Sequence, residues 1–268
     1  MLEIDQLDLR RLSKVSGLLT DIDDTLSTAG KITAEAFDAL WRLHDAQLTV
    51  AVVTGRPAGW CDHIARFWPV DAVIGENGGF YFCHDGTKLC RRYLYDSDER
   101  IAFRRRLSDI RDRILDEVPG AAIASDQPWR EYDLAIDFCE DVEPLPGKQV
   151  LRIKEMFEEA GAHAKISSIH VNGWYGDFDK LSTARLWAHE RLGVDLDAEP
   201  DRFVYCGDSP NDEPMFGFFP LSFGMANIKP FTQMMQQLPA FVTAKPCGAG
   251  FTQVVDSILR ARASGGGQ

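Results

Sequence analysis

The stretch "GLLTDIDDT" (residues 17–25) places three carboxylates directly after a short apolar run. Residues 17–21 read as a buried strand, whereas Asp21, Asp23 and Asp24 are poor strand formers that repel one another at this spacing. In open α/β sheets, ligands bind beyond the carboxyl ends of the strands. The crowded acids therefore indicate a functional site at the end of the first strand.

Two later apolar runs end in the same way. "LTVAVVTG" (48–55) leads into Arg56, and "RFVYCGD" (202–208) leads into "GDSPND" (207–212). Helix-period segments separate the apolar runs, which is typical of strands joined by helical crossovers in a mostly parallel sheet. We therefore expect all three polar clusters to meet at one edge of this sheet.

The chain divides into a core and an insertion. In the core, strands are expected at 17–21, 48–55, 71–79, 202–208 and 220–226, with helices at 33–46, 57–67, 180–193, 211–217 and 249–262. In the insertion, a hairpin around 84–87 precedes a helix (97–117), a strand (132–138), a helix (147–160) and a strand (164–173). The pattern predicts an α/β fold with a core of residues 1–84 and 177–268, interrupted by a domain at 85–176.

The acidic residues at the strand ends have the chemistry of a metal site. Asp21, Asp208 and Asp212 would form a cluster of hard oxygen ligands, and without a cation their repulsion would raise at least one pKa. Mg²⁺ fits best, because it prefers oxygen and keeps waters and substrate phosphate among its ligands. A single aspartate of this kind is more often a turn residue or helix cap, so the prediction rests on the three clusters together.

Neighbouring residues suit phosphate chemistry. Asp23 can turn towards the same site, protonate a leaving oxygen and later deprotonate water. Thr54 and the amide of Gly55 offer neutral donors for phosphate oxygens, and glycine lets the backbone approach closely. Lys180, at the start of the helix after the insertion, can supply a point charge.

Composition narrows the partners and the compartment. The 268 residues carry a net charge of −12, which disfavours nucleic acid and anionic membranes as partners. The six cysteines are dispersed without a C-x-x-C pair, no apolar run approaches a membrane span, and no basic segment precedes an apolar one at the start. We expect a cytoplasmic protein with a small-molecule substrate, and the sequence carries no signal for oligomeric state.

These motifs together resemble those of the haloacid dehalogenase (HAD) superfamily. "DIDDT" (21–25) is similar to its D-x-D-x-T first motif, "VVTGR" (52–56) to its second and "GDSPND" (207–212) to its fourth, with Lys180 in the place of the third. The insertion after "GENGG" (75–79) resembles the type IIB cap of sucrose-phosphate, trehalose-phosphate and mannosyl-phosphoglycerate phosphatases and of phosphomannomutases. The resemblance implies a Rossmann-like core with an inserted cap.

The resemblance also implies roles for single residues. Asp21 would attack phosphorus, and Asp23 would act as acid and then as base. Mg²⁺ would be held by Asp208 and Asp212, together with the Asp21 carboxylate and the Asp23 carbonyl oxygen, and Asn211 would orient a ligand. Lys180 is followed by Leu181, where many cap-bearing relatives have glycine, so Lys165 and Lys229 are alternatives for the third motif.

The hypothesis that follows is a Mg²⁺-dependent phosphatase that hydrolyses a phosphorylated sugar or similar small metabolite through an aspartyl phosphate. A phosphosugar mutase is the alternative, since the motifs do not separate transfer to water from transfer to a sugar. A phosphoacceptor signalling domain fits less well, because such domains have no inserted cap. For the cap, Arg130, Asn172 and Trp174 are expected to contact a sugar, although core packing explains Trp174 almost as well.

Overall fold

A large, mostly parallel sheet forms the centre of the molecule in the computed structural model, which describes residues 1–265. Within these residues the sheet has nine strands, and only its last two neighbouring pairs are antiparallel. In order across the sheet they are β1 (Leu2–Glu3), β15 (Phe241–Val242), β14 (Ser222–Gly224), β13 (Phe203–Gly207), β2 (Gly17–Thr20), β5 (Thr49–Val53), β6 (Ala72–Gly75), β7 (Phe80–His84) and β8 (Leu89–Tyr93).

The register of the central strands aligns their carboxyl ends. Thr20, the last residue of β2, pairs with Cys206 on β13 and with Val52 on β5. The backbone N–H of Asp21 continues this ladder by donating to the carbonyl oxygen of Cys206 at 2.9 Å. The residues that follow the three strands therefore start from neighbouring positions.

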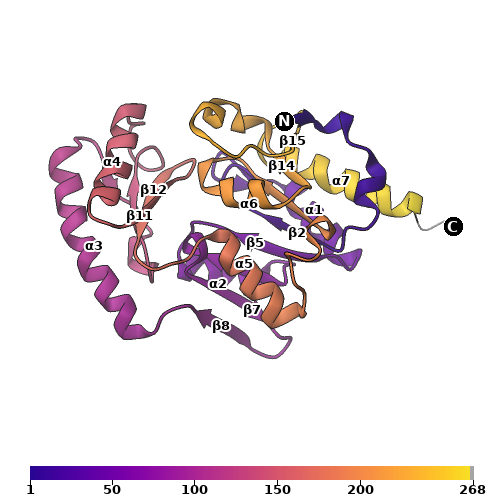
Figure 1. The fold of residues 1–268 in the computed structure, drawn as a ribbon, viewed down its shortest axis with the longest axis horizontal. Helices are drawn as coiled ribbons and strands as arrows, with labels where there is room; N and C mark the ends of the chain where they lie inside the picture. The colour runs from indigo at the N-terminus through magenta and orange to yellow at the C-terminus, as the bar shows by residue number, and fades with distance from the viewer. Residues whose placement is uncertain (266–268) are drawn as a thin grey trace.

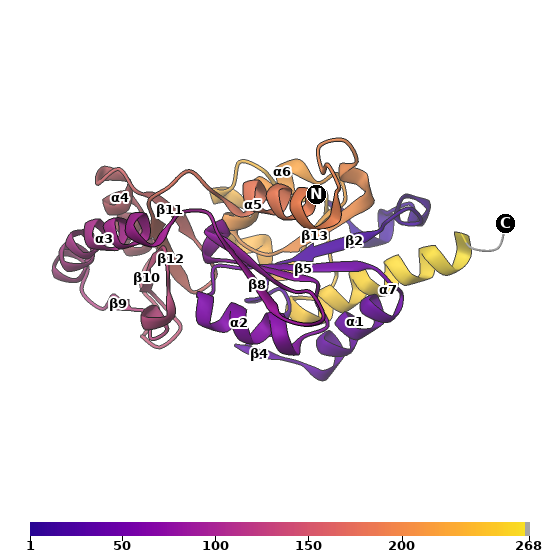
Figure 2. The same cartoon turned by 90° about the horizontal axis from the view of Figure 1, so that it is seen from below.

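Helices cover both faces of the large sheet, as Figure 2 shows with the sheet nearly edge-on. Neighbouring strand residues such as Leu18 and Leu19 belong to different buried clusters, which explains why these strands are apolar throughout. One face packs against α1 (Ala34–Asp45), α2 (Ala58–Phe67) and α7 (Cys247–Gly265), and the other against α5 (Lys180–Trp187) and α6 (Glu213–Phe218). A small hairpin of β3 (Ser27–Thr28) and β4 (Lys31–Ile32) follows β2.

A second sheet with two helices forms a cap at one end of the large sheet (Figure 1). Its strand order is β11 (His163–Ile166), β12 (His170–Trp174), β10 (Leu134–Asp137) and β9 (Ala122–Ile123), and each neighbouring pair is antiparallel. Helices α3 (Ser97–Glu117) and α4 (Gly147–Glu159) pack on this sheet and give the cap its own hydrophobic core.

One buried core side chain ties the cap to the core. Glu76, in the turn after β6, accepts hydrogen bonds from the backbone N–H groups of three consecutive cap residues, Glu131, Tyr132 and Asp133. It also accepts the N–H of Ala58 at the start of α2. The carboxylate thus serves as the hydrogen-bond acceptor for these amides in place of main-chain carbonyl groups.

The expected α/β fold, with a Rossmann-like parallel sheet and an inserted cap, is confirmed. The single strand expected at 164–173 is wrong, because the chain turns at Ser167 and forms the antiparallel pair β11–β12. The segment 71–79, expected to hold a strand and a glycine-rich turn, forms β6 up to Gly75, and Glu76 and Asn77 then adopt positive φ angles of 45° and 54°. The division at residues 84 and 176 stays a prediction; β8, from the expected cap range, joins the large sheet.

Candidate active site

Three aspartates converge at the carboxyl ends of the central strands. Asp21 follows β2, Asp208 follows β13, and Asp212 lies in the turn Pro210–Asp212. Each offers a carboxylate oxygen such that the three atoms lie within 4.8 Å of one another, and all three residues are buried. The backbone N–H groups of Asp208 and Ser209 donate to Asp212 Oδ2 at 2.9 and 3.2 Å, which fixes that carboxylate. The structure brings these predicted metal ligands together.

Burial and mutual repulsion raise the pKa values of two of these acids, Asp21 and Asp208. Burial is the main cause for Asp21, whose pKa rises to about 8, and the neighbouring Asp212 and Asp23 add to it while Lys180 opposes it. Burial, with Asp21 and Asp212 nearby, also raises the pKa of Asp208 well above its ordinary value. A hard divalent cation would relieve this repulsion, so the donor set fits Mg²⁺.

Lys180 lies inside the acidic cluster. Its Nζ donates to Asp21 Oδ1 and to Asp212 Oδ1, both at 2.7 Å, and its side chain is 1% exposed. Burial alone would lower the pKa of Lys180, but the two carboxylates outweigh it and raise that pKa above the ordinary value. The alternatives Lys165 and Lys229 make no such contact among the described residues.

A close backbone approach places Lys180. Gly78, at φ 114°, lies against the carbonyl of Asp179, so that a Cβ at this position would stand 2.1 Å from that oxygen. Asp179 caps α5 by accepting the N–H of Ser182, and Thr183 donates its hydroxyl to the Gly78 carbonyl at 2.5 Å. Only glycine allows the helix carrying Lys180 to begin here.

Thr54 and Gly55 lie beside the acidic cluster, at the end of β5. Thr54 is fully buried, and its hydroxyl accepts the N–H of Arg56 at 3.0 Å. A Cβ on Gly55 would meet the side-chain nitrogen of Asn77 at 3.3 Å. Asn77 Oδ1 accepts from Asn211 at 3.2 Å, while Asn77 Nδ2 is buried without a hydrogen-bond partner among the described residues. Asn77 Nδ2 is therefore a further donor beside the expected phosphate position.

Asp23 is held by Arg56. The Arg56 Nε lies 2.9 Å from Asp23 Oδ2, and its Nη2 lies 2.8 Å from Asp23 Oδ1. The Asp23 side chain is 18% exposed, whereas that of Arg56 is 5% exposed. This fork orients the carboxylate expected to exchange protons with the substrate.

The cap closes over these groups. The cavity between core and cap has a volume of only about 10 Å³. Because this space is too small for a phosphate ester, the cap must move outward to admit the substrate. Its lining comprises core residues (Asp21, Asp23, Gly55, Arg56, Ser209 and Asn211) and cap residues (Ser167, Ser168, Ile169, His170 and Asn172).

The three expected sugar contacts lie in different surroundings. Asn172 lines the cavity and donates to Asp133 Oδ2 at 2.7 Å. Arg130 does not line it; its buried guanidinium pairs with Asp126 and Asp133. Trp174 is buried within the cap, where its indole N–H donates to the Phe178 carbonyl at 3.3 Å. These contacts support the explanation that Trp174 serves packing within the cap.

Several residues in or beside the cavity lining carried no recognised signal in the sequence. Arg56 stood in the quoted "VVTGR" motif, and Asn77 stood in "GENGG", but neither received a role. Ser168 and His170 lie in and beside the β11–β12 turn, which was expected to be continuous strand. The interruption of the apolar pattern by "KISSIH" (165–170) is the signal that could have located this turn.

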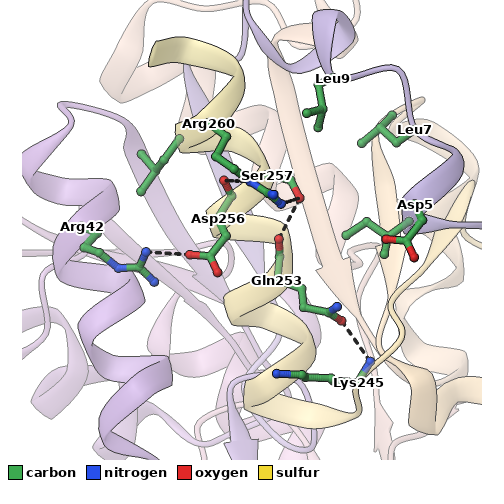
Figure 3. A pocket seen from close by; sticks show the side chains of 11 residues that line it. Asp5, Leu7, Leu9, Arg42, Lys245, Gln253, Asp256, Ser257 and Arg260 are labelled. Carbon is green, nitrogen blue, oxygen red and sulfur yellow. Dashed lines mark hydrogen bonds and ion pairs between the residues drawn. The ribbon is translucent and has the colours of Figure 1, made fainter. Parts of the chain in front are cut away.

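A second cavity, of about 750 Å³, lies between α7 and the N-terminal segment (Figure 3). Three of its charged side chains are engaged with neighbours: Arg42 pairs with Asp256 at 2.7 Å, and Arg260 donates to Ser257. The three predicted metal ligands do not line it. Its size alone therefore does not make it the candidate site.

Comparison with known proteins agrees with the motifs. A family model described as haloacid dehalogenase-like hydrolase matches residues 18–99. The phosphoglycolate phosphatase of Pyrobaculum aerophilum is 30% identical over 249 residues, covering 90% of this chain and 95% of that protein. The chain belongs to the haloacid dehalogenase-like hydrolases. The expectation of an enzyme of the phosphatase type in this superfamily is confirmed.

Solved structures of HAD proteins share the fold. The sucrose-phosphatase from Synechocystis is 17% identical with a TM-score of 0.62, covering 91% of this chain and 98% of that one. A sugar phosphatase of HAD subclass IIB is 12% identical with a TM-score of 0.61, covering 90% of this chain and 98% of that one. Among the helices described in residues 1–265, none has both the length and the apolar character needed to cross a bilayer.

Proposed function

We propose that this HAD hydrolase is a Mg²⁺-dependent phosphomonoesterase that works through an aspartyl phosphate on a small phosphorylated metabolite. The observation that carries the proposal is the position of Lys180, whose Nζ lies 2.7 Å from both Asp21 and Asp212, inside a cluster of buried carboxylates. The names of the relatives, phosphoglycolate phosphatase and sugar phosphatase, support a small phosphate ester as substrate.

Each residue would have one task in the reaction. Asp21 attacks phosphorus while Asp23, oriented by Arg56, protonates the leaving oxygen and then takes a proton from the attacking water. Lys180, the Thr54 hydroxyl and the Gly55 amide hold the phosphoryl oxygens. Asp21, Asp208 and Asp212 would hold Mg²⁺ together with the Asp23 carbonyl oxygen, and Asn211 would orient one of these ligands. When bound, the ion would supply positive charge to the phosphoryl group.

The mutase alternative has less support. It requires a second phosphate site in the cap, yet Arg130 is engaged by Asp126 and Asp133, and Arg104 lies 3.3 Å from Glu131. Arginines that are already paired with carboxylates on the same domain offer little net charge to a second phosphate.

The test is phosphate release from a panel of sugar phosphates, phosphorylated hydroxy acids and nucleotides, with Mg²⁺ and with EDTA. Asp21→Asn removes the nucleophile and should lower turnover by at least about 1,000-fold. Asp23→Asn should still become phosphorylated by an activated ester, seen as one added phosphoryl group by mass spectrometry. Asp5→Asn, at the cavity beside α7, is the matched control with unchanged turnover. Near-native Mg²⁺-dependent release by Asp21→Asn would refute the mechanism.

A further inference from the structure

A cap carboxylate occupies the free edge of Arg56. Glu140 Oε1 lies 2.6 Å from Arg56 Nη2 and its Oε2 lies 3.3 Å from Nη1, so the two groups face each other as a fork. The other edge of the same guanidinium holds Asp23. Arg56 therefore presents two carboxylate positions side by side, one filled by the expected proton donor and one by the cap.

An imidazole flanks the same position. His170 Nε2 lies 2.9 Å from Glu140 Oε2 as an ion pair, and no other polar contact of this buried atom is described within residues 1–265. The His170 side chain is 3% exposed and lines the cavity beside Arg56. A buried ring nitrogen beside a guanidinium, whose described partner is a carboxylate, is suited to an anionic ligand.

Glu140 is less firmly fixed than the groups that it contacts. The Arg56 guanidinium is held by Asp23 and Asp126 and stacks over the Trp60 ring at 4.4 Å. The Glu140 side chain is 26% exposed, and its loop is fixed separately by the backbone N–H, which donates to Asp137 Oδ1 at 2.7 Å. The Glu140 carboxylate can therefore rotate into solvent without unfolding its loop, while Arg56 stays in place.

We propose that Arg56 and His170 form a subsite for a carboxylate of the substrate, and that Glu140 fills it when no substrate is bound. The proposal rests on the phosphomonoesterase function. Because Asp23 and Glu140 share the Arg56 Nη2, a carboxylate bound here lies next to the group that protonates the ester oxygen. This geometry suits the phosphate ester of a short 2-hydroxy acid, in which the carboxylate group and the ester oxygen are bonded to the same carbon atom.

Glu140 already has the ionisation state that such a stand-in needs. Partial burial alone would raise the pKa of Glu140, but His170 and Arg56 outweigh it and hold that pKa at about 2. A substrate carboxylate would thus replace one anion by another without adding a charge to the acidic surroundings of Arg56.

The test compares two esters of similar size, 2-phosphoglycolate and 2-hydroxyethyl phosphate, which differ in having a carboxylate or a hydroxymethyl group. The quantity measured is the ratio of their kcat/KM values. Glu140→Gln weakens the internal competitor and should raise this ratio about tenfold, whereas His170→Gln should lower it about tenfold. Glu143→Gln, an exposed carboxylate in the same loop, is the matched control and should leave the ratio unchanged.

The outcomes separate the two proposals. If both esters are hydrolysed and the ratio stays within about twofold of wild type in Glu140→Gln and in His170→Gln, the subsite is refuted and Glu140 only joins the cap to the core. If wild type releases no phosphate from either ester or from the wider panel, the phosphomonoesterase function fails first. Inhibition of 2-hydroxyethyl phosphate hydrolysis by glycolate that strengthens in Glu140→Gln would support the subsite without a carboxylated substrate.

Discussion

Substitution of Gly78 by alanine should reduce both stability and catalysis. The new Cβ would stand 2.1 Å from the Asp179 carbonyl oxygen, about 1.3 Å short of the 3.4 Å at which ordinary contact begins. The φ of 114° adds backbone strain for any residue with a side chain. Together the strain and the clash should lower the free energy of unfolding by about 2–4 kcal/mol.

Catalysis should fall because the clash acts on the residue next to Lys180. Relief of the clash requires Asp179 and the start of α5 to move by about 1 Å, and a displacement of this size in a group that positions a reacting phosphate costs about 100-fold in kcat. The assay is steady-state phosphate release on the best substrate, with unfolding by urea measured on the same samples.

The matched control is Gly86→Ala. Gly86 also has a positive φ, of 88°, but nothing lies within 4 Å of a Cβ there, and it belongs to the exposed β7–β8 turn. It should lose about 1–2 kcal/mol of stability and retain the wild-type kcat. A folded Gly78→Ala enzyme with wild-type kcat would refute the view that this close approach places Lys180.

Two further predictions concern the metal and the cap. Mg²⁺ should bind more tightly as the pH rises from about 6 to 8, because the buried Asp21, with a pKa of about 8, is protonated below that value and must lose its proton to ligate. Calorimetry in two buffers of different ionisation enthalpy measures the protons released, and an affinity independent of pH would contradict the assignment of Asp21. Glu76→Gln should speed amide hydrogen exchange at residues 131–133 about tenfold, while exchange in α1 stays unchanged. The reason is that one carboxylate oxygen is replaced by an NH₂ group, which cannot accept hydrogen bonds from these backbone N–H groups. Equal exchange in the two proteins would show that other contacts hold the cap.

The parts of the site that the sequence predicted are those that depend on strand ends. Asp21 and Asp208 follow apolar runs that could be recognised locally, and parallel pairing then brings them to one edge without further information. Lys180 was predicted from its position at the start of a helix, and its Nζ contacts Asp21 and Asp212 although Leu181 rather than glycine follows it. The glycine that the close backbone approach to Asp179 requires is Gly78, which lies on another segment of the chain.

The contacts between core and cap could not be predicted in the same way. Arg56 and Glu140 are separated by 84 positions, and neither the loop nor the cap sheet that joins them has a periodicity that sets their distance. Arg130 was expected to contact the substrate because polar groups beside an aromatic face suit a sugar, whereas its guanidinium is buried and paired with Asp126 and Asp133. The turn at Ser167 contains neither glycine nor proline, so the β11–β12 hairpin was read as one strand.

The way in which Glu76 holds the cap has a consequence for the evolution of such enzymes. Among the described residues, its carboxylate accepts hydrogen bonds from the main-chain N–H groups of residues 131–133 and from none of their side chains. The joint uses main-chain groups of residues 131–133, whereas the cap residues that line the cavity lie at 167–172, so substitutions at the lining positions leave these hydrogen-bonding groups unchanged. A core built in this way can keep one catalytic apparatus while its cap diversifies under selection for new substrates.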